Sequence, residues 1–218
     1  MTESDFGADV TNKLREQYFL LLPKIRLLTT RLEVEIQYHV RNIAQELDPY
    51  EQVIVKSRVK DCEGAIRKLR GEGNVFTPEK TYSLTDLKDL AAVRVLVFPS
   101  KRLTQIDELL RTFEPFRRWS PDPLKYAGGS REAPKYYGTF DEVGGELQGE
   151  YQILPILIGN FLEVEHSAMY KPVGWAKGAD RDEVLKVLRT DIEKLLIQFE
   201  KRFDDFVEQN RQSSQKPR

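Results

Sequence analysis

The chain is poor in the residues that form disulfides and most transition-metal sites. Its 218 residues include a single cysteine, Cys62, and two histidines, His39 and His166. One cysteine excludes an intramolecular disulfide and a multi-cysteine metal site, and two histidines are too few for a histidine-rich metallohydrolase centre. These classes of site are therefore excluded from the start.

An excess of one charge and a long apolar run are missing as well. Lys and Arg total 34 against 35 Asp and Glu, so the net charge of −1 gives no overall attraction to nucleic acid, membranes or acidic substrates. The apolar run at residues 18–22 is far shorter than the ~18 residues that span a bilayer. Met1 is followed by polar residues, where a secretory signal has basic and then apolar ones. We expect a soluble cytoplasmic protein without a membrane partner.

The chain does contain enough apolar sequence for one substantial core. Hydrophobic residues make up 40% of the total, so we expect a single domain over residues 1–218. Apolar residues recur at helical steps over residues 25–47, which predicts a long amphipathic helix delimited by Pro23 and Pro49. A glycine pair ends a second predicted helix at residues 61–70. The same periodicity predicts helices at residues 103–113, at 156–170 and from 181 onward.

Strands are predicted between these helices. Residues 91–98 are apolar and β-branched, which predicts a strand buried on both faces at the centre of a sheet. Residues 136–143 and 146–155 flank Gly144-Gly145, a strong signal for a two-residue hairpin turn. Residues 115–134 contain four prolines and two glycines without periodicity and predict a long loop over a functional site. This order of elements predicts the α+β class.

Four cations lie within eleven residues around the start of the second helix: Arg58, Lys60, Arg67 and Lys68. The free N–H groups and the dipole of a helix N-terminus also favour anions, so this cluster can hold a triphosphate. The alternative is a solvated basic face balanced by Asp61 and Glu63, because charged runs usually face water. The residues alone leave both interpretations open.

Carboxylates mark two of the predicted strands. Asp89 precedes the strand at residues 91–98, where its oxygens are well placed to hold Mg²⁺, although a polar residue is also common at such a boundary. Glu150 and Gln152 are two apart in a strand and share one face of the sheet. That face is either part of a site or the exposed polar side of a hairpin.

Three of these segments, residues 58–69, 89–94 and 150–152, resemble in order the synthetase pattern of the RelA/SpoT alarmone synthetases. The resemblance covers about residues 50–171, and it implies a nucleotidyltransferase-like fold with a mixed sheet and flanking helices. It also implies transfer of the diphosphate of ATP to the 3′-hydroxyl of GDP or GTP, with Mg²⁺ as cofactor. With only two histidines, such an enzyme is expected to make alarmones and not to degrade them.

The resemblance implies roles residue by residue for the donor and the metal. The four cations fall in register with the residues that bind ATP phosphates in the family, with Gly64 in place of the usual serine. Asp89 corresponds to the magnesium ligand. Glu150 corresponds to the acid that serves a second metal or polarises the attacking hydroxyl.

Further residues match the family on the acceptor side. Arg94, which closes the motif that begins at Asp89, and Gln152 are expected to contact the acceptor. Three residues of a later helix are expected to support the site from behind, and they match a Glu-x-x-His-x-x-x-Tyr-Lys pattern: Glu163, His166 and Lys171.

The segment at residues 134–140 stands where the family has a loop whose tyrosine stacks on guanine. Motif spacing favours Tyr136 as the stacking residue. A two-residue glycine turn would instead pair Tyr137 with Gln152 and place Tyr137 on the face of Glu150. Packing of both rings across a hairpin is a further interpretation.

Three replacements relative to the family pattern leave the identity of the acceptor undecided. Phe140 stands where histidine is usual, and Leu154 and Pro155 replace the family's Arg and Thr. One alternative is a toxic relative that pyrophosphorylates the 3′ end of tRNA or makes adenosine alarmones, with an antitoxin protein as partner. Another is a non-catalytic nucleotide-binding or protein-interaction module. The apolar stripe from Val184 to Phe206 suits a homo-oligomer or packing within the chain equally well.

Overall fold

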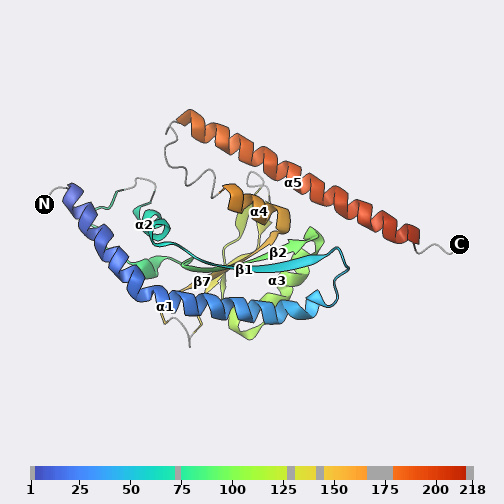
Figure 1. Cartoon of the computed structure of the whole chain (residues 1–218), viewed down its shortest axis with the longest axis horizontal. Helices are drawn as coiled ribbons and strands as arrows, with labels where there is room; N and C mark the ends of the chain where they lie inside the picture. Colours follow the sequence, from blue (N-terminus) through green and yellow to red (C-terminus); the bar gives the residue numbers. More distant parts are fainter. Residues whose placement is uncertain (1–2, 72–74, 127–130, 141–144, 166–178, 215–218) are drawn as a thin grey trace.

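The computed structural model describes residues 3–71, 75–126, 131–140, 145–165 and 179–214 (Figure 1). In chain order the helices and strands are α1 Glu3–Ala44, β1 Gln52–Val59, α2 Cys62–Arg70, β2 Ala91–Phe98, α3 Leu103–Thr112, β3 Ser120–Pro121, β4 Leu124–Tyr126, β5 Arg131–Ala133, β6 Lys135–Gly138, β7 Gly149–Pro155, α4 Ile156–Glu165 and α5 Ala179–Ser214.

Five strands form one mixed sheet in the order β1-β2-β7-β6-β3. In this sheet β2 and β7 run parallel, whereas the other neighbouring strands are antiparallel. β4 and β5 pair separately as a small ribbon. The predicted α+β class, a mixed sheet with flanking helices, is confirmed. The centre of the sheet is β7, however, and not the strand at residues 91–98.

The two faces of the sheet bury two different apolar clusters. Successive residues of a strand point to opposite faces, so Val93 and Ile153 lie on one face while Leu96 and Leu154 share the other. The first face packs on α1 and α3 in the main core, and the second packs on Ile158 of α4. Figure 1 shows α1 below the sheet and α4 and α5 above it. Polar residues of the same strands share the α4 face.

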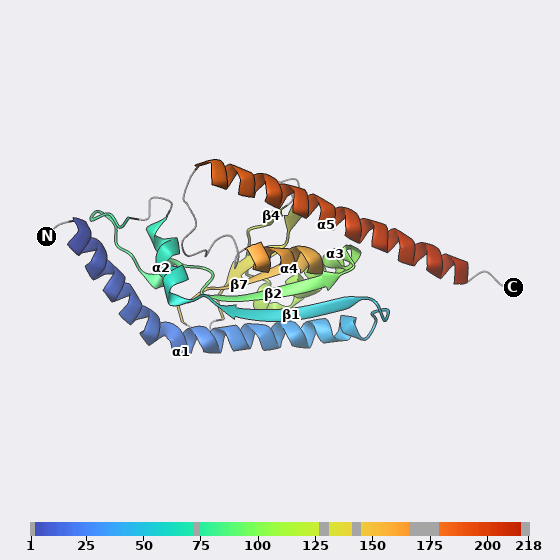
Figure 2. The same cartoon turned by 45° about the horizontal axis from the view of Figure 1, so that its top comes forward.

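Helix α1 is one continuous helix of 42 residues, although the sequence predicted a start after Pro23. That prediction is wrong because residues before the proline continue the apolar period: Leu14 and Tyr18 are buried, as are Ile25 and Leu28. Their burial offsets the hydrogen bond that a proline removes from a helix. Prolines also bend helices, and Figure 2 shows a bent α1.

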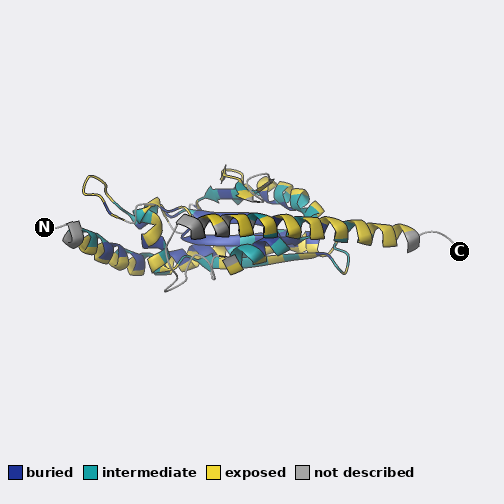
Figure 3. Ribbon diagram, turned by 90° about the horizontal axis from the view of Figure 1, so that it is seen from above, coloured by how far each residue is buried: buried dark blue, intermediate teal, exposed yellow. Residues whose placement is uncertain are grey.

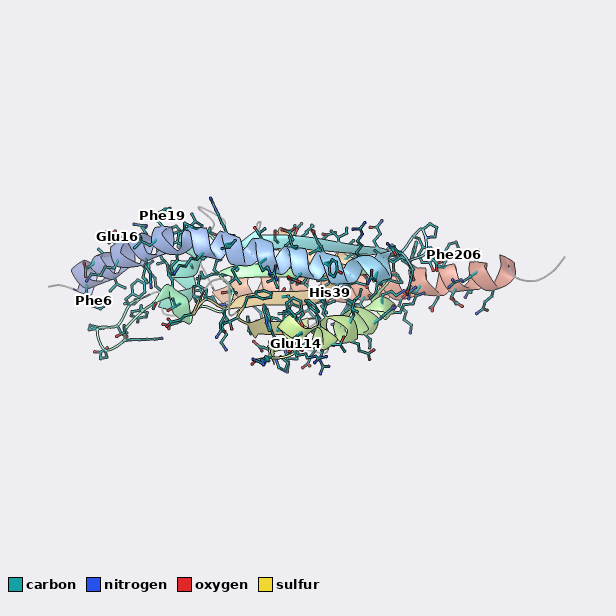
Figure 4. The ribbon with its side chains drawn as sticks, turned by 90° about the horizontal axis from the view of Figure 1, so that it is seen from below. Phe6, Glu16, Phe19, His39, Glu114 and Phe206 are labelled. Carbon is teal, nitrogen blue, oxygen red and sulfur yellow. The ribbon has the colours of Figure 1, made fainter. Side chains whose placement is uncertain are left out.

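One of the two histidines packs between α1 and α3. The ring centroid of His39 lies 3.3 Å from that of Phe113, directly after α3, and Figure 4 shows His39 on the α3 side of α1. Burial lowers the pKa of its imidazole. His39 therefore serves the packing of the two helices.

Helix α2 confirms the prediction for residues 61–70 in detail. Asp61 is its N-cap, and its carboxylate accepts a hydrogen bond of 2.8 Å from the N–H of Gly64. Gly71 follows the last helical residue with a φ of 70°, a conformation that glycine adopts without strain. The cap fixes where the cationic helix begins.

Two segments differ from the sequence prediction. The run at residues 52–59 was not predicted as a strand, yet it forms the edge strand β1, consistent with its four β-branched residues. The predicted loop at residues 115–134 contains the short strands β3, β4 and β5. Ala133 of this segment packs with Leu96 and Leu154, at the end of the sheet face away from Glu150. Ala133 therefore lies beside the polar residues of the sheet, and residues 127–130 of the segment are outside the described residues.

Helix α5 crosses the α4 side of the molecule with an unusual distribution of side chains. Glu193 and Glu200 are buried, and Phe203 packs on Phe98 with ring centroids 5.2 Å apart. Leu195 and Phe199 are 64% and 53% exposed, and Figure 3 shows the exposed length of the helix. Packing within the chain thus accounts for Phe203 but not for most of the apolar stripe, and the homo-oligomer stays a prediction. Among the described residues, no helix is both long and apolar enough to cross a membrane.

A glycine in β6 provides a test of the packing. A Cβ atom at Gly138 would overlap the Trp119 ring, so we expect Gly138→Ala to lower the free energy of unfolding by about 1–3 kcal/mol. Gly7→Ala is the control, because no atom lies within 4 Å of a Cβ there and alanine favours the helix by about 0.5–1 kcal/mol. Urea unfolding of both variants gives the comparison, and equal stabilities would contradict the packing described.

Candidate functional site

An ion-pair cluster joins β1, α2 and the start of β2. The Oδ2 atom of Asp89 lies 2.9 Å from the Nζ atom of Lys60 and 2.9 Å from that of Lys68. Lys60 directly follows β1, and its backbone N–H donates a 2.9 Å hydrogen bond to the carbonyl of Leu90. Asp89 is only 6% exposed. The carboxylate therefore holds two cations from separate elements against the mouth of β2.

Helix α1 braces this cluster from the other side. The Tyr18 hydroxyl donates a 2.9 Å hydrogen bond to the carbonyl oxygen of Lys60. Arg15 forms an ion pair of 2.9 Å with Glu63 on α2. The N-terminal part of α1 thus contacts both the end of β1 and the cationic helix, an arrangement visible in Figure 2.

The charge state of Asp89 follows from these contacts. Burial would raise the pKa of its carboxyl group, but the Lys60 and Lys68 ammonium groups outweigh burial and hold the pKa below the usual 3.8. The carboxylate is therefore ionised at neutral pH. One of its oxygens, Oδ1, is buried and has no hydrogen-bond partner among the described residues.

A chain of polar contacts runs from β7 to α4. The Nε2 atom of Gln152 donates to Glu150 at 2.5 Å, and the Nε atom of Arg94 donates to Oε1 of Gln152 at 3.3 Å. Glu163 on α4 lies 3.7 Å from Arg94 and 3.2 Å from Lys56. Glu150 is 4% exposed, so these contacts orient a buried carboxylate. Gln152 and Arg94, predicted as acceptor contacts, here hold Glu150 in place.

The pairing of β6 with β7 decides which tyrosine faces Glu150. Tyr137 pairs with Glu150 and Tyr136 with Tyr151, so the predicted register with Tyr137 opposite Gln152 is wrong. Gly144 of the predicted turn lies outside the described residues. The actual register differs from that prediction by two residues. Because side chains alternate with period two, Tyr137 still lies on the Glu150 face.

The motif-based preference for Tyr136 is contradicted by its position. The Tyr136 ring stacks on Tyr151 at 4.8 Å between centroids, and its hydroxyl donates to Asp107 of α3 at 2.7 Å. Tyr136 therefore belongs to the core beside α3. Burial raises the pKa of Tyr137, and so do the negative charges of Glu150, Asp122 and Asp89.

A pocket of 470 Å³ lies on the α4 face beside Glu150, between β1, β2 and α4. Arg58 and Arg94 line it, and the pKa of the Arg94 guanidinium is lowered by burial and by the neighbouring charge of Arg58. Arg67 is exposed on α2. Three of the four predicted phosphate-binding cations therefore lie at the site, two on Asp89 and one in this pocket.

The donor set is suited to Mg²⁺. In the part of the chain that the structure describes, no group of three or more His, Cys, Asp or Glu side chains gathers as a metal site. Mg²⁺ is usually held by one or two carboxylates together with substrate phosphates and water. The unpartnered Oδ1 of Asp89 and the buried carboxylate of Glu150 fit that description.

Some residues of the site were missed in the sequence, and others lie outside the described residues. Lys56 faces Glu163, and Lys88 lies over the Tyr137 ring at 5.5 Å from its centroid. Lys56 could have been found from the β-branched run around it, because Lys56 and Arg58 are two apart on one strand. Two predicted supporting residues, His166 and Lys171, are not among the described residues.

Known proteins resemble this chain in structure. Neither the family models nor the curated proteins give a match. The small alarmone synthetase 1 from Bacillus subtilis aligns with a TM-score of 0.66 and 17% identity over 90% of this chain and 99% of its own. The chain has the fold of the small alarmone synthetases.

Two further solved structures extend the match to this synthetase fold. The same Bacillus subtilis protein, bound to its product pppGpp, aligns with a TM-score of 0.66 and 17% identity over 89% of this chain and 98% of its own. A GTP pyrophosphokinase family protein from Streptococcus pneumoniae aligns with a TM-score of 0.58 and 18% identity over 86% and 91%. The synthetase fold thus spans most of the described chain.

The pKa of Asp89 predicts how stability depends on pH. Because the folded-state pKa lies below 3.8, the stabilisation by this carboxylate is fully present above 3.8 and is lost as the pH falls through the folded-state pKa. We expect the difference in unfolding free energy between the wild type and Asp89→Asn to be largest above about pH 5 and to narrow on acidification. Urea unfolding across a pH series measures it.

Asp9→Asn is the control for that series, since Asp9 forms an exposed pair with Lys13 on α1. The difference in unfolding free energy between Asp9→Asn and the wild type should stay small at every pH. A difference for Asp89→Asn that does not change with pH would contradict the ion-pair cluster.

Proposed function

We propose that the protein is an alarmone synthetase that transfers the diphosphate of ATP to the 3′-hydroxyl of GDP or GTP. The observation that carries the proposal is that two buried carboxylates, Asp89 and Glu150, lie at the starts of the neighbouring parallel strands β2 and β7, where Ala92 pairs with Glu150. Cations for a triphosphate lie on the β1 side of these carboxylates and an aromatic ring lies on the β6 side. The synthetase fold supports this assignment, and we take residues 1–218 to form one such domain.

The donor side is assigned to the cations at the start of α2. Lys60 and Lys68, now paired with Asp89, and Arg58 in the adjacent pocket would hold the phosphates of ATP. Arg67 is exposed on the same helix and would reach the outer phosphates. Neutralising phosphate charge is the main requirement of this chemistry, and fixed cations supply it without reorganisation.

Glu150 is assigned to the attacking hydroxyl. The 3′-oxygen of the acceptor forms a bond to the β-phosphorus of ATP, the bond from that phosphorus to the bridging oxygen of the α-phosphate breaks, and AMP leaves. Glu150 takes the proton of the hydroxyl. Gln152 and Arg94 keep its carboxylate in position through the contacts of 2.5 and 3.3 Å. Positioning of this kind contributes much of the rate enhancement.

Asp89 and Glu150 would hold Mg²⁺. The ion, when bound with ATP, neutralises the charge that develops on the transferred phosphates. Asp89 is ionised by its lysine neighbours, as a metal ligand must be. When ATP phosphates bind Lys60 and Lys68, the Asp89 carboxylate becomes available as a ligand.

The proposal predicts loss of transfer when either carboxylate is neutralised. Asp89→Asn and Glu150→Gln should each reduce transfer by ~100-fold or more at neutral pH while the protein stays folded. The measurement follows label from γ-labelled ATP with Mg²⁺ into GDP, GTP, ATP or tRNA, with AMP release and thermal unfolding monitored in parallel. Glu146→Gln, exposed before β7, should keep full activity.

The outcomes separate the candidate functions. Turnover comparable to that of the wild type in either carboxylate variant would contradict the two-carboxylate mechanism. Label in tRNA or in an adenosine nucleotide would identify a toxic relative of the synthetases. Label in no acceptor would favour a non-catalytic module with this fold.

The register predicts different effects for the two tyrosines. Tyr137→Ala should raise the KM for the acceptor and cost ~1–3 kcal/mol in kcat/KM, the range for loss of base stacking. Tyr136→Ala should instead lower the free energy of unfolding by about 3–5 kcal/mol, because it opens a cavity beside Tyr151. Tyr137→Phe separates the ring from the hydroxyl near Glu150. A rise in the KM for the acceptor in Tyr136→Ala alone would show that Tyr136, and not Tyr137, stacks on the base.

A further inference from the structure

The polar side chains on the α4 face of the sheet form two rows that run across the strands. The first row crosses β1, β2, β7 and β6 and consists of Arg58, Ala92, Glu150 and Tyr137. The second row lies two residues along each strand and consists, in the same order, of Lys56, Arg94, Gln152 and Lys135. Side chains alternate with period two, so both rows share one face. Three of the four residues in the second row are cations, and this row lies beside the proposed base.

Glu163 on α4 supplies the counter-charge to two of these cations. Its Oε2 atom lies 3.2 Å from the Nζ atom of Lys56, and its Oε1 atom lies 3.7 Å from the Nη1 atom of Arg94. Asn160, three residues earlier on the same helix, accepts a hydrogen bond of 3.4 Å from Lys56. Lys56 thus ties two side chains of α4 to the edge strand β1, and the carboxylate of Glu163 bridges two cations.

The contacts continue from Arg94 to the proposed base. Arg94 donates to Gln152 at 3.3 Å, and Gln152 donates to Glu150 at 2.5 Å. Each group in the series from Lys56 through Glu163 to Glu150 therefore holds the next one by an opposite charge or a hydrogen bond. The side chain of Lys56 is 42% exposed and that of Arg94 is 20% exposed, so the series leads from the surface into the buried site.

The electrostatics of Arg94 show why a fixed Glu163 matters. The pKa of the Arg94 guanidinium is lowered by burial and by the neighbouring charge of Arg58, and is raised by Glu163 and Glu150. Glu163 therefore offsets the repulsion between two arginines of the same pocket. A half-exposed glutamate side chain has several rotamers, and it takes a single one only where a partner holds it. Lys56 is that partner, with Glu163 as the bridge to Arg94.

We propose that Lys56 and Glu163 are positioning residues of the transfer reaction. Lys56 holds Glu163, Glu163 holds Arg94, and Gln152 passes this fixed geometry to the carboxylate of Glu150. This inference rests on the proposed function and adds to it a requirement: the edge strand β1 and helix α4 must be joined by the Lys56–Glu163 pair for the base to be aligned. The residue that begins the series then lies at the surface, away from the reacting atoms.

The first test separates positioning from substrate binding. Lys56→Ala and Glu163→Gln should each lower kcat by about tenfold and leave the KM for ATP and for the acceptor nearly unchanged, because the base is misaligned while the substrates still bind. Lys56→Arg keeps the cation and should restore kcat. Lys125→Ala, which removes the lysine of an exposed cross-strand pair with Glu132, is the matched control and should leave kcat unchanged. A rise in the KM for ATP with unchanged kcat would show direct contact with the donor and overturn the proposal.

The second test separates positioning from simple fastening of α4. The double variant Lys56→Glu, Glu163→Lys restores an ion pair between β1 and α4 but sets a cation against Arg94. Thermal unfolding should return toward the wild-type temperature, whereas kcat should stay low. Recovery of kcat together with stability would reduce the pair to a fastening of the helix and overturn the positioning role.

Failure of this inference is distinguishable from failure of the proposed function. If the wild type transfers diphosphate and both single variants keep its kcat, the positioning role fails while the synthetase assignment stands. If the wild type transfers to no acceptor, the synthetase assignment fails, and urea unfolding still tests the series of contacts. Lys56→Ala and Gln152→Ala, two strands apart, should then show effects that do not add, because they share that series. Additive effects would overturn it.

Discussion

The pairing of Asp89 with Lys60 and Lys68 is the interaction on which the donor end of the molecule depends. It joins the end of β1, the face of α2 and the start of β2, and adds to the backbone pairing of β1 with β2 and the Lys60–Leu90 backbone contact. A buried carboxylate is costly to leave unpaired, so each of the three groups requires the other two. The result is a fixed patch with one surplus positive charge at the mouth of a buried strand.

That surplus has a consequence for nucleotide binding in the proposed mechanism. The lysines are neutralised in part by Asp89 while no phosphate is present, and this allows the patch to be half buried without an uncompensated charge. Incoming phosphates offer the lysines stronger partners and release the carboxylate for the ion that accompanies ATP. The free protein is thus pre-organised for a change of partners. Binding then requires little movement of the backbone, because both lysines are held by secondary structure.

Local features were predictable from the sequence, whereas long-range ones were not. The glycine that ends α2, the strand at residues 91–98 and the shared face of Glu150 and Gln152 follow from capping chemistry and period-two alternation. The prediction that the helix starts after Pro23 was wrong, because the burial of Leu14 and Tyr18 on the same helix outweighs the helix-breaking tendency of proline. A pocket of 590 Å³ lined by Arg31, Lys88 and Arg118 could not be foreseen, since these residues are far apart in the sequence and only the fold brings them together. The choice between Tyr136 and Tyr137 depended on a register that no local pattern fixes.

The register between β6 and β7 also limits how this chain can change by insertion and deletion. Insertion or deletion of one residue within β6 would exchange the faces of Tyr137 and Tyr136. The core ring would then enter the site, and the site ring would enter the core. A change of two residues keeps each side chain on its face and only slides the strand. Relatives that vary the length of this strand should therefore differ by even numbers of residues, unless a bulge absorbs the odd one. Changes in the length of this strand on the acceptor side are thus expected in steps of two residues.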